Sequence, residues 1–208
     1  MVNRKCFPNF VQYILYYMLK GLQQLVSIES GMAFRSRVEH DPSGSCSVIQ
    51  MKDISETSYA IEGSPSKIQL DAADPSKLLN AGDLLFVAKG NRNVVVRYQL
   101  DTPAVAVALF YVIRTGGNRA LSDYLLWYLN SPTAQNYFHA HRRGASVGNI
   151  RIDDLKKLEV PVLDSKKQQV IGNLFSKFME EKELMRQLIE KREVYIQNSL
   201  NTLIRKQS

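Results

Sequence analysis

The longest regular pattern of hydrophobic and polar positions lies in the last quarter of the chain. Residues 165–206 contain no Pro and one early Gly, and apolar residues recur among charged ones at helical spacing. Steps of four and three residues starting at Ile171 reach ten positions, of which seven are apolar: Ile171, Phe175, Phe178, Met185, Ile189, Ile196 and Leu203. Such an a/d repeat is typical of a helix that packs lengthwise on another helix. The pattern therefore predicts one continuous helix.

About 42 helical residues make a rod on the order of 60 Å long. The rest of the chain has no second segment of similar length and pattern. We therefore expect the apolar stripe to contact another molecule. The alternative is a solvated helix that folds back on its own domain.

Before this helix, short β-rich runs alternate with turn residues. The predicted strands are Ser45–Met51, Leu84–Ala88, Val94–Leu100 and Ala104–Ile113, the last of which is almost wholly apolar and therefore predicted to be central. We expect a mixed sheet as the core of this domain.

Helical patterns frame these strands. We predict an amphipathic helix over Phe10–Val26, a second that begins with Ser122 as its N-cap and ends at Ser131, and a third over Pro132–Ala140. The fold class is thus α/β (mixed α+β), with a globular domain over residues 1–164 and a long helix over residues 165–208. Length 208 with 45% hydrophobic residues suits one core of ordinary size and this appendage.

Composition limits the classes of partner, the kinds of metal or disulfide site, and the cellular location that we expect. The formal net charge of +7 favours a polyanion such as DNA, although many basic proteins simply remain soluble this way. The only cysteines, Cys6 and Cys46, form no CxxC pair, so we expect neither structural zinc nor a disulfide framework, and a cytoplasmic location. The apolar run Phe10–Leu19 is too short to span a bilayer and lacks a following cleavage site; secretion is the alternative.

Two basic loops without acidic residues are the candidates for chemistry. The first is Lys89–Asn93, set between two predicted strands with no Asp or Glu from Leu84 to Leu100, and the second is His139–Arg151. Gly allows close approach to a phosphate, Lys supplies charge, and Arg or Asn can form paired hydrogen bonds with base edges. A solvated connection is the simpler interpretation of either loop alone.

The sequence gives little indication of catalysis. It has no Asn/Asp-Pro-Pro-Tyr/Phe motif for amino-methyl transfer, and Gly116-Gly117 is not followed by the Gly-Lys-Ser/Thr of a phosphate-binding loop. The three histidines have no neighbouring Cys or acidic cluster to complete a metal site. We therefore predict no catalytic residues, no metal and no cofactor.

Several segments, in order, resemble one known family. They are Leu25–Gly31, Phe34–Arg37, Val48–Ile54, Ala81–Phe86 with Lys89–Asn93, and Ser146–Leu158 leading through Val160-Pro161-Val162 to Lys167–Ile171. Their order and the terminal helix resemble a target recognition domain of type I restriction-modification specificity subunits over about residues 22–206. The resemblance implies a non-catalytic subunit that recognises double-stranded DNA and positions methyltransferase subunits and, in the full complex, a restriction subunit.

In that family two recognition domains are held apart by two long antiparallel helices, and each domain reads half of a split DNA sequence. The chain departs from this plan by having one recognition domain and one long helix. Two copies that pair their helices in an antiparallel coiled coil would restore the plan as a homodimer and predict a bipartite palindromic site. The alternative is a truncated or decoy specificity protein that assembles through its helix without productive recognition.

If the resemblance holds, the basic positions divide into two roles. Phosphate contacts are expected from Arg35, Arg37, Lys52, Lys89, Arg142 and Arg143. Base contacts are expected from some of Asn91, Arg92, Asn93, Ser146 and Asn149.

Overall fold

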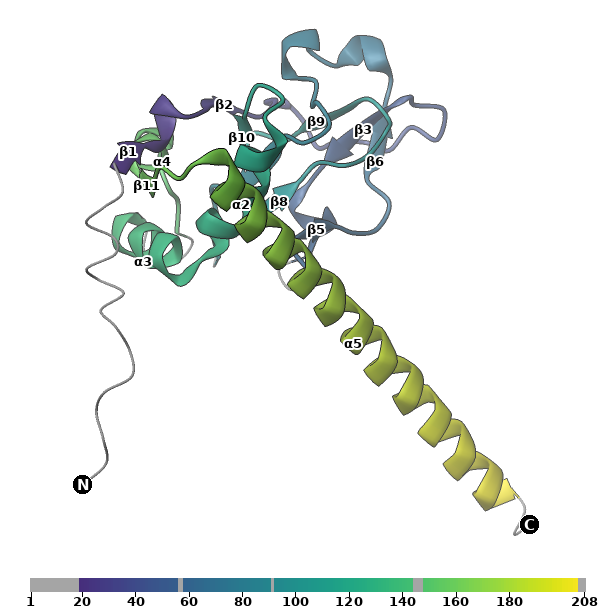
Figure 1. Ribbon diagram of the computed structural model, residues 1–208. Helices are drawn as coiled ribbons and strands as arrows, with labels where there is room; N and C mark the ends of the chain where they lie inside the picture. The colour runs from purple at the N-terminus through teal and green to yellow at the C-terminus, as the bar shows by residue number, and fades with distance from the viewer. Residues whose placement is uncertain (1–18, 56–57, 91, 144–147, 206–208) are drawn as a thin grey trace, which may run out of the picture. The chain divides into compact units, whose positions relative to one another are not determined.

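The computed structural model describes residues 19–55, 58–90, 92–143 and 148–205 (Figure 1). The chain divides into two compact units, Met1–Gly172 and Asn173–Ser208. The α-helices are α2 (Arg119–Asn130), α3 (Pro132–His141), α4 (Ile152–Lys157) and α5 (Ser165–Arg205), and the 3₁₀ helices are η1 (Leu22–Gln24), η2 (Met51–Asp53), η3 (Leu70–Ala72) and η4 (Pro75–Lys77). The mixed α+β class with a long terminal helix is confirmed.

The described residues of the first unit form four small sheets rather than one. An antiparallel sheet has the order β2 (Ser27–Ser30), β10 (Phe110–Arg114), β7 (Leu84–Val87) and β8 (Val95–Arg97). A mixed sheet has the order β6 (Ser66–Ile68), β3 (Cys46–Ile49) and β9 (Ala104–Ala106), with β3 and β9 parallel. Two further pairs are β1 (Leu19–Gly21) with β11 (Glu159–Pro161), and β4 (Ile54–Ser55) with β5 (Ala60–Ile61).

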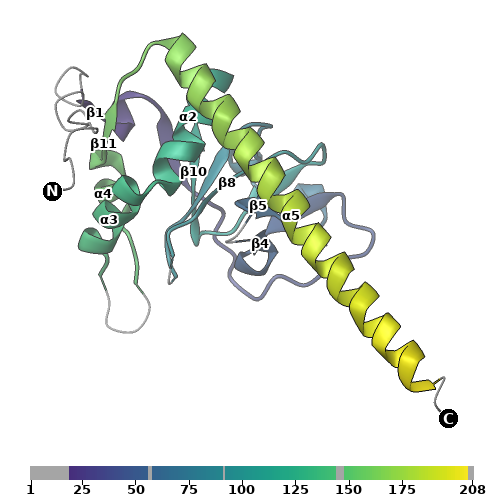
Figure 2. The same ribbon diagram turned by 60° about the horizontal axis from the view of Figure 1, so that its bottom comes forward.

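The four-stranded sheet is covered on both faces. Leu84 and Phe86 of β7 belong to the core that includes residues of α2, α3 and α4, whereas Leu85 and Val87 belong to the core formed with β3 and β9. Successive side chains of a strand point to opposite faces, so each residue of β7 is buried. Figure 1 accordingly shows α3 and α4 on one side of this unit and β5 on the other, and Figure 2 shows β4 and β5 together on that other side.

Three predicted elements differ from the observed ones. The run Ala104–Ile113 is two strands in different sheets, β9 and β10, separated by a turn in which the amide of Phe110 donates to the carbonyl of Val107 at 3.0 Å. Helix α2 begins at Arg119, because the side chain of Asn118, not Ser122, accepts the capping hydrogen bond from the amide of Leu121.

The predicted helix over Phe10–Val26 is also wrong in its described part. Residues 19–21 form β1, which pairs with β11, and η1 follows it. Residues 10–18 lie outside the described residues. The helix predicted from Pro132 is confirmed as α3, with Ser131 as its cap.

Helix α5 matches the predicted long helix to within one residue at its end. Its first two turns belong to the first unit, where Ile171 packs on the helix-side core and Gly172 is buried. In the second unit the apolar stripe is exposed: Phe178, Met185, Ile189 and Leu203 are 56%, 57%, 59% and 62% accessible. Among the described residues, no helix is long and apolar enough to cross a membrane.

Candidate nucleic-acid interface

The first basic loop joins β7 to β8 and is held in shape by a buried asparagine. Asn93 has no exposed surface, and its side-chain amide donates to the carbonyl of Val87 at 2.9 Å. Gln135 of α3 in turn donates to the carbonyl of Asn93 at 3.0 Å. With this anchor inside, Lys89 and Arg92 are exposed on the loop.

The second basic segment lies against the first. Asn149 forms antiparallel bridges with both Lys89 and Arg143. The amide of Gly90 donates to the carbonyl of Gly148 at 3.0 Å, and the backbone of Arg143 exchanges two hydrogen bonds with that of Asn149, at 3.1 and 2.9 Å. The fold therefore joins two segments that are about 50 residues apart in the sequence into one ladder of backbone hydrogen bonds.

Arg142 ties the two segments together through its side chain. Its Nη2 atom donates to Oδ1 of Asn93 at 2.9 Å. Its aliphatic stem passes over Gly148, where an added Cβ would lie only 1.8 Å from Cδ of Arg142. Only glycine fits there while Arg142 keeps this position.

These contacts bear on two of the predicted roles. Asn93 is fully buried and holds the loop from within, so it does not face a base. Arg142 is partly exposed and donates one hydrogen bond to Asn93, and its phosphate contact stays a prediction. The predicted contacts Asn91 and Ser146 lie outside the described residues.

A cavity of about 460 Å³ adjoins the first loop. It is lined by residues 32–34, Ser36, Val38, residues 50–52 and the β9–β10 turn, residues 107–109. The amide of Ala88 donates to the carbonyl of Leu109 in that turn at 3.0 Å, and a Cβ on Gly90 would lie 3.8 Å from Cε of Met51. The cavity and the loop are therefore neighbours.

Predicted basic residues surround this cavity. Lys52 is one of its lining residues, and Arg35 and Arg37 flank Ser36, another lining residue. All three basic side chains are exposed. We call the following set the basic surface: Arg35, Arg37, Lys52, Lys89, Arg92, Arg143 and Asn149, each of which is exposed.

The acidic residue next to Lys52 points inward. Asp53 follows Lys52 in the sequence but is 3% exposed, and its carboxylate accepts a hydrogen bond from the amide of Gln50 at 2.8 Å. The two basic loops themselves contain no Asp or Glu. Exposed guanidinium and ammonium groups in such a setting can neutralise phosphates, and Arg and Asn can form paired hydrogen bonds with base edges.

Metal chemistry has no candidate in this region. Within the described ranges, no group of three or more His, Cys, Asp or Glu residues is placed to hold a metal ion. The ring of His141 stacks on Tyr137 with centroids 4.0 Å apart, and its Nδ1 lies 2.8 Å from the carbonyl of Tyr137. Its ring therefore helps to end α3.

Two contributors to this region carry no local signal in the sequence. Gln135 lies in α3 and reaches back 42 residues to the loop, and the hydroxyl of Tyr111 in β10 donates to the carbonyl of Ile150 at 2.9 Å. Both act on backbone carbonyls that are distant in sequence. Only the tertiary fold places them there.

Solved structures share the fold of this chain. The chain resembles the type I restriction-modification system S subunit from M. genitalium (TM-score 0.57, 18% identity, covering 91% of this chain and 44% of that chain) and the HsdS subunit from Thermoanaerobacter tengcongensis (0.58, 14%, 89% and 42%). A third match comes from a structure on complex assembly and conformational transition of the type I R-M system (0.63, 15%, 88% and 43%).

The chain thus spans less than half the length of the solved structures that it matches. No curated protein matches it. The family model described as type I restriction modification DNA specificity domain matches residues 17–193, which include both basic loops and most of α5. The chain therefore belongs to the family of type I restriction-modification DNA specificity domains.

Proposed function

We propose that this chain is a sequence-specific DNA-recognition subunit that reads one half-site of a bipartite target through the basic surface. The observation that carries the proposal is the backbone ladder between the two basic loops, in which Asn149 bridges Lys89 and Arg143. Neither loop alone distinguishes a DNA contact from a solvated connection. Two basic loops without acidic residues, fixed side by side, are better suited to follow a DNA backbone than either loop alone.

Within this surface the exposed cations and amides take different roles. Arg35, Arg37, Lys52, Lys89 and Arg143 contact phosphates and set the orientation of the domain on the duplex. Arg92 and Asn149 contact base edges, together with Asn91 and Ser146 from the segments outside the described residues. The subunit supplies no catalytic group of its own and positions methyltransferase subunits on the DNA.

The second part of the proposal concerns assembly. The stripe of α5 is exposed in the described residues of the second unit, and a helix with such a face is stabilised by packing on a second helix. Two copies that pair these helices antiparallel would form an isologous dimer, since the same surface of each copy is used. A dimer of this kind places two recognition domains on one duplex.

The test is sequencing of modified bases in DNA from cells that express the cognate methyltransferase with and without this gene. A split methylated motif that appears only with the gene supports the proposal, and a palindromic motif supports the dimer. If the methyltransferase is active with another specificity subunit but gives no motif with this chain, DNA recognition by this chain is refuted, and the alternative is a truncated or decoy specificity protein.

A further inference from the structure

A second cavity lies at the opposite end of the four-stranded sheet from the basic surface. It has a volume of about 500 Å³ and is lined by residues that precede β7 (80–83), by the last residue of β8 and the two that follow it (97–99), by the last residue of β10 and the three that follow it (114–117), and by two residues of α2. The first basic loop follows β7 and precedes β8, so the sheet separates the two sites. Ligand sites of small molecules commonly have volumes of about 300 to 1,000 Å³.

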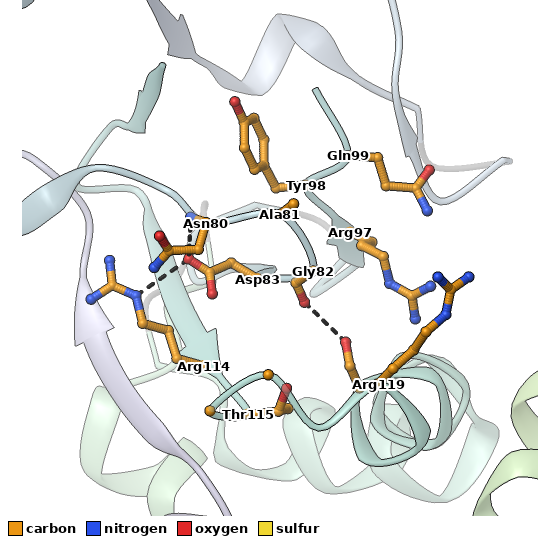
Figure 3. A pocket seen from close by; sticks show the side chains of 13 residues that line it. Asn80, Ala81, Gly82, Asp83, Arg97, Tyr98, Gln99, Arg114, Thr115 and Arg119 are labelled. Carbon is orange, nitrogen blue, oxygen red and sulfur yellow. Dashed lines mark hydrogen bonds and ion pairs between the residues drawn. The ribbon is translucent and has the colours of Figure 1, made fainter. Parts of the chain in front are cut away.

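Two guanidinium groups meet beside this cavity. Arg97 of β8 and Arg119 of α2 both form ion pairs with the same carboxylate, that of Asp123, the second through Nε at 3.7 Å. Figure 3 shows the two arginine side chains next to each other, with Arg97 reaching down from the sheet and Arg119 up from the helix. Two cations that share one carboxylate leave a net positive charge at this point.

The hydrogen bonds of Arg97 are incomplete. Its side chain is 13% exposed, and its Nε atom is buried without a hydrogen-bond partner in the described structure. An unpaired buried donor on a charged group costs free energy, but this atom has no accessible surface, so Arg97 can contact a ligand only through the exposed part of its guanidinium group. Arg119, by contrast, is 87% exposed, so its donors are open to the solvent and to the cavity.

Arg114, the third arginine of the lining, is already satisfied. It donates to Asp83 at 3.3 Å, to Glu29 at 3.3 Å and to the carbonyl of Leu78 at 2.9 Å. It therefore forms part of the wall. The open positive charge of the cavity is that of Arg97 and Arg119.

The backbone next to Arg119 leaves room for a ligand. Gly116 and Gly117 have φ values of 63° and 81°, and a Cβ added at either would have no atom within 4 Å. They immediately precede Asn118, the cap of α2. The N-terminal end of a 12-residue helix carries partial positive charge, which adds to that of the two arginines.

We propose that this cavity binds a small phosphate-bearing anion, whose oxygen atoms lie between Arg97 and Arg119. Phosphate matches the planar, paired donors of guanidinium groups, and the volume accommodates a mononucleotide as well as free phosphate. The proposal is independent of DNA recognition, because its residues are separate from the basic surface.

The test is calorimetric titration of the full chain with inorganic phosphate and with adenosine monophosphate, at constant ionic strength set with sodium chloride. We expect saturable binding that Arg119→Gln weakens about tenfold or more, because a charge-assisted pair is lost. Lys67→Gln removes the same charge from an exposed site on β6 and should leave binding unchanged. Tighter binding of the nucleotide identifies a nucleotide site, and equal binding identifies a phosphate site.

A second variant tests the guanidinium group of Arg97. Arg97→Lys keeps the positive charge near Asp123 but removes the planar, paired donors, so we expect weaker phosphate binding. The proposal is overturned if no saturable binding occurs, or if Arg119→Gln binds phosphate as the native chain does. It is also overturned if Arg119→Gln weakens duplex DNA binding, since the cavity would then belong to the DNA interface.

Discussion

The side chain of Asn93 has a structural role although it lies in a basic loop. A fully buried amide that donates to Val87 and accepts from Arg142 fixes the course of the backbone on which exposed residues stand. Buried polar groups of this kind are costly to remove, because their partners remain inside without hydrogen bonds.

We therefore expect Asn93→Ala to lower the free energy of unfolding by about 2 to 3 kcal/mol, since two hydrogen bonds are lost and a buried carbonyl is left unpaired. The matched control is Arg92→Ala, an exposed neighbour, which should change stability by less than about 0.5 kcal/mol. Urea denaturation of both variants measures the difference. Equal stabilities would show that Asn93 does not anchor the loop.

Arg143 tests the phosphate role, because it is exposed and its backbone is held by Asn149 whatever its side chain. Arg143→Ala should weaken binding to all duplexes alike and reduce the slope of log K against log salt by about 1, the value for one phosphate contact. Fluorescence anisotropy titrations across a salt series provide the slope. An unchanged slope would rule out a phosphate contact by Arg143.

Asn149 tests base readout. Asn149→Ala should relax preference at one position of the target, at about 1 to 3 kcal/mol for a lost pair of hydrogen bonds, while binding to unrelated duplexes stays the same. Competition between the preferred duplex and single-base variants measures this. Uniform weakening on every duplex would instead assign Asn149 to the backbone.

At the residue scale, the sequence located the basic loops but not their internal contacts. The absence of acidic residues over Leu84–Leu100 is visible along the chain and indicated exposed positive charge. Asn93 turns inward because it forms hydrogen bonds with Val87, Arg142 and Gln135, whereas Arg92 stays exposed. Arg142 and Gln135 lie more than 40 residues away in the sequence. Residue type alone cannot distinguish an asparagine that binds a base from one that binds its own fold.

At the scale of elements, a helix or strand was predictable from the sequence when its hydrophobic repeat was long and regular. Helix α5 was predicted almost in full, because its repeat continues over many turns. The run Ala104–Ile113 was read as one strand, because neither Gly nor Pro marks the turn at residues 107–109. The division of the β-structure into separate sheets follows from long-range pairing, which local patterns do not encode.

The beginning of α5 depends on a close approach to α2. A Cβ added at Gly172 would lie 2.4 Å from Cβ of Asp123, so the two helices meet where only a hydrogen atom fits. Gly172 was visible in the sequence as the single glycine of the helix, but its neighbour was not.

We expect Gly172→Ala to be destabilising by about 1 to 3 kcal/mol, the usual cost of overpacking. The sign is informative, because Gly to Ala within a helix would otherwise stabilise it by about 1 kcal/mol. Asn173→Ala is the matched control at the adjacent exposed position, where no such conflict exists. Stabilisation by Gly172→Ala in urea denaturation would mean that the two helices do not approach this closely.

At the scale of the whole molecule, the stripe of α5 determines whether one chain suffices for the proposed function. Large apolar side chains such as Met185 and Ile189 are more than half exposed among the residues of the described structure. Burying such a stripe against a second copy removes apolar surface from water, at about 25 cal/mol per Å². Charges introduced on the stripe should therefore oppose assembly, whereas charges on the other face should not.

We expect the double variant Met185→Glu, Ile189→Glu to be monomeric at micromolar concentration, whereas the native chain has twice the monomer mass in light scattering. Gln187→Glu adds a charge to the opposite face of the same turns and should leave the dimer intact. A native chain that is already monomeric would refute pairing through α5. Because a two-fold dimer reads two identical half-sites, the double variant should also lose the palindromic methylation motif while each domain still binds a single half-site.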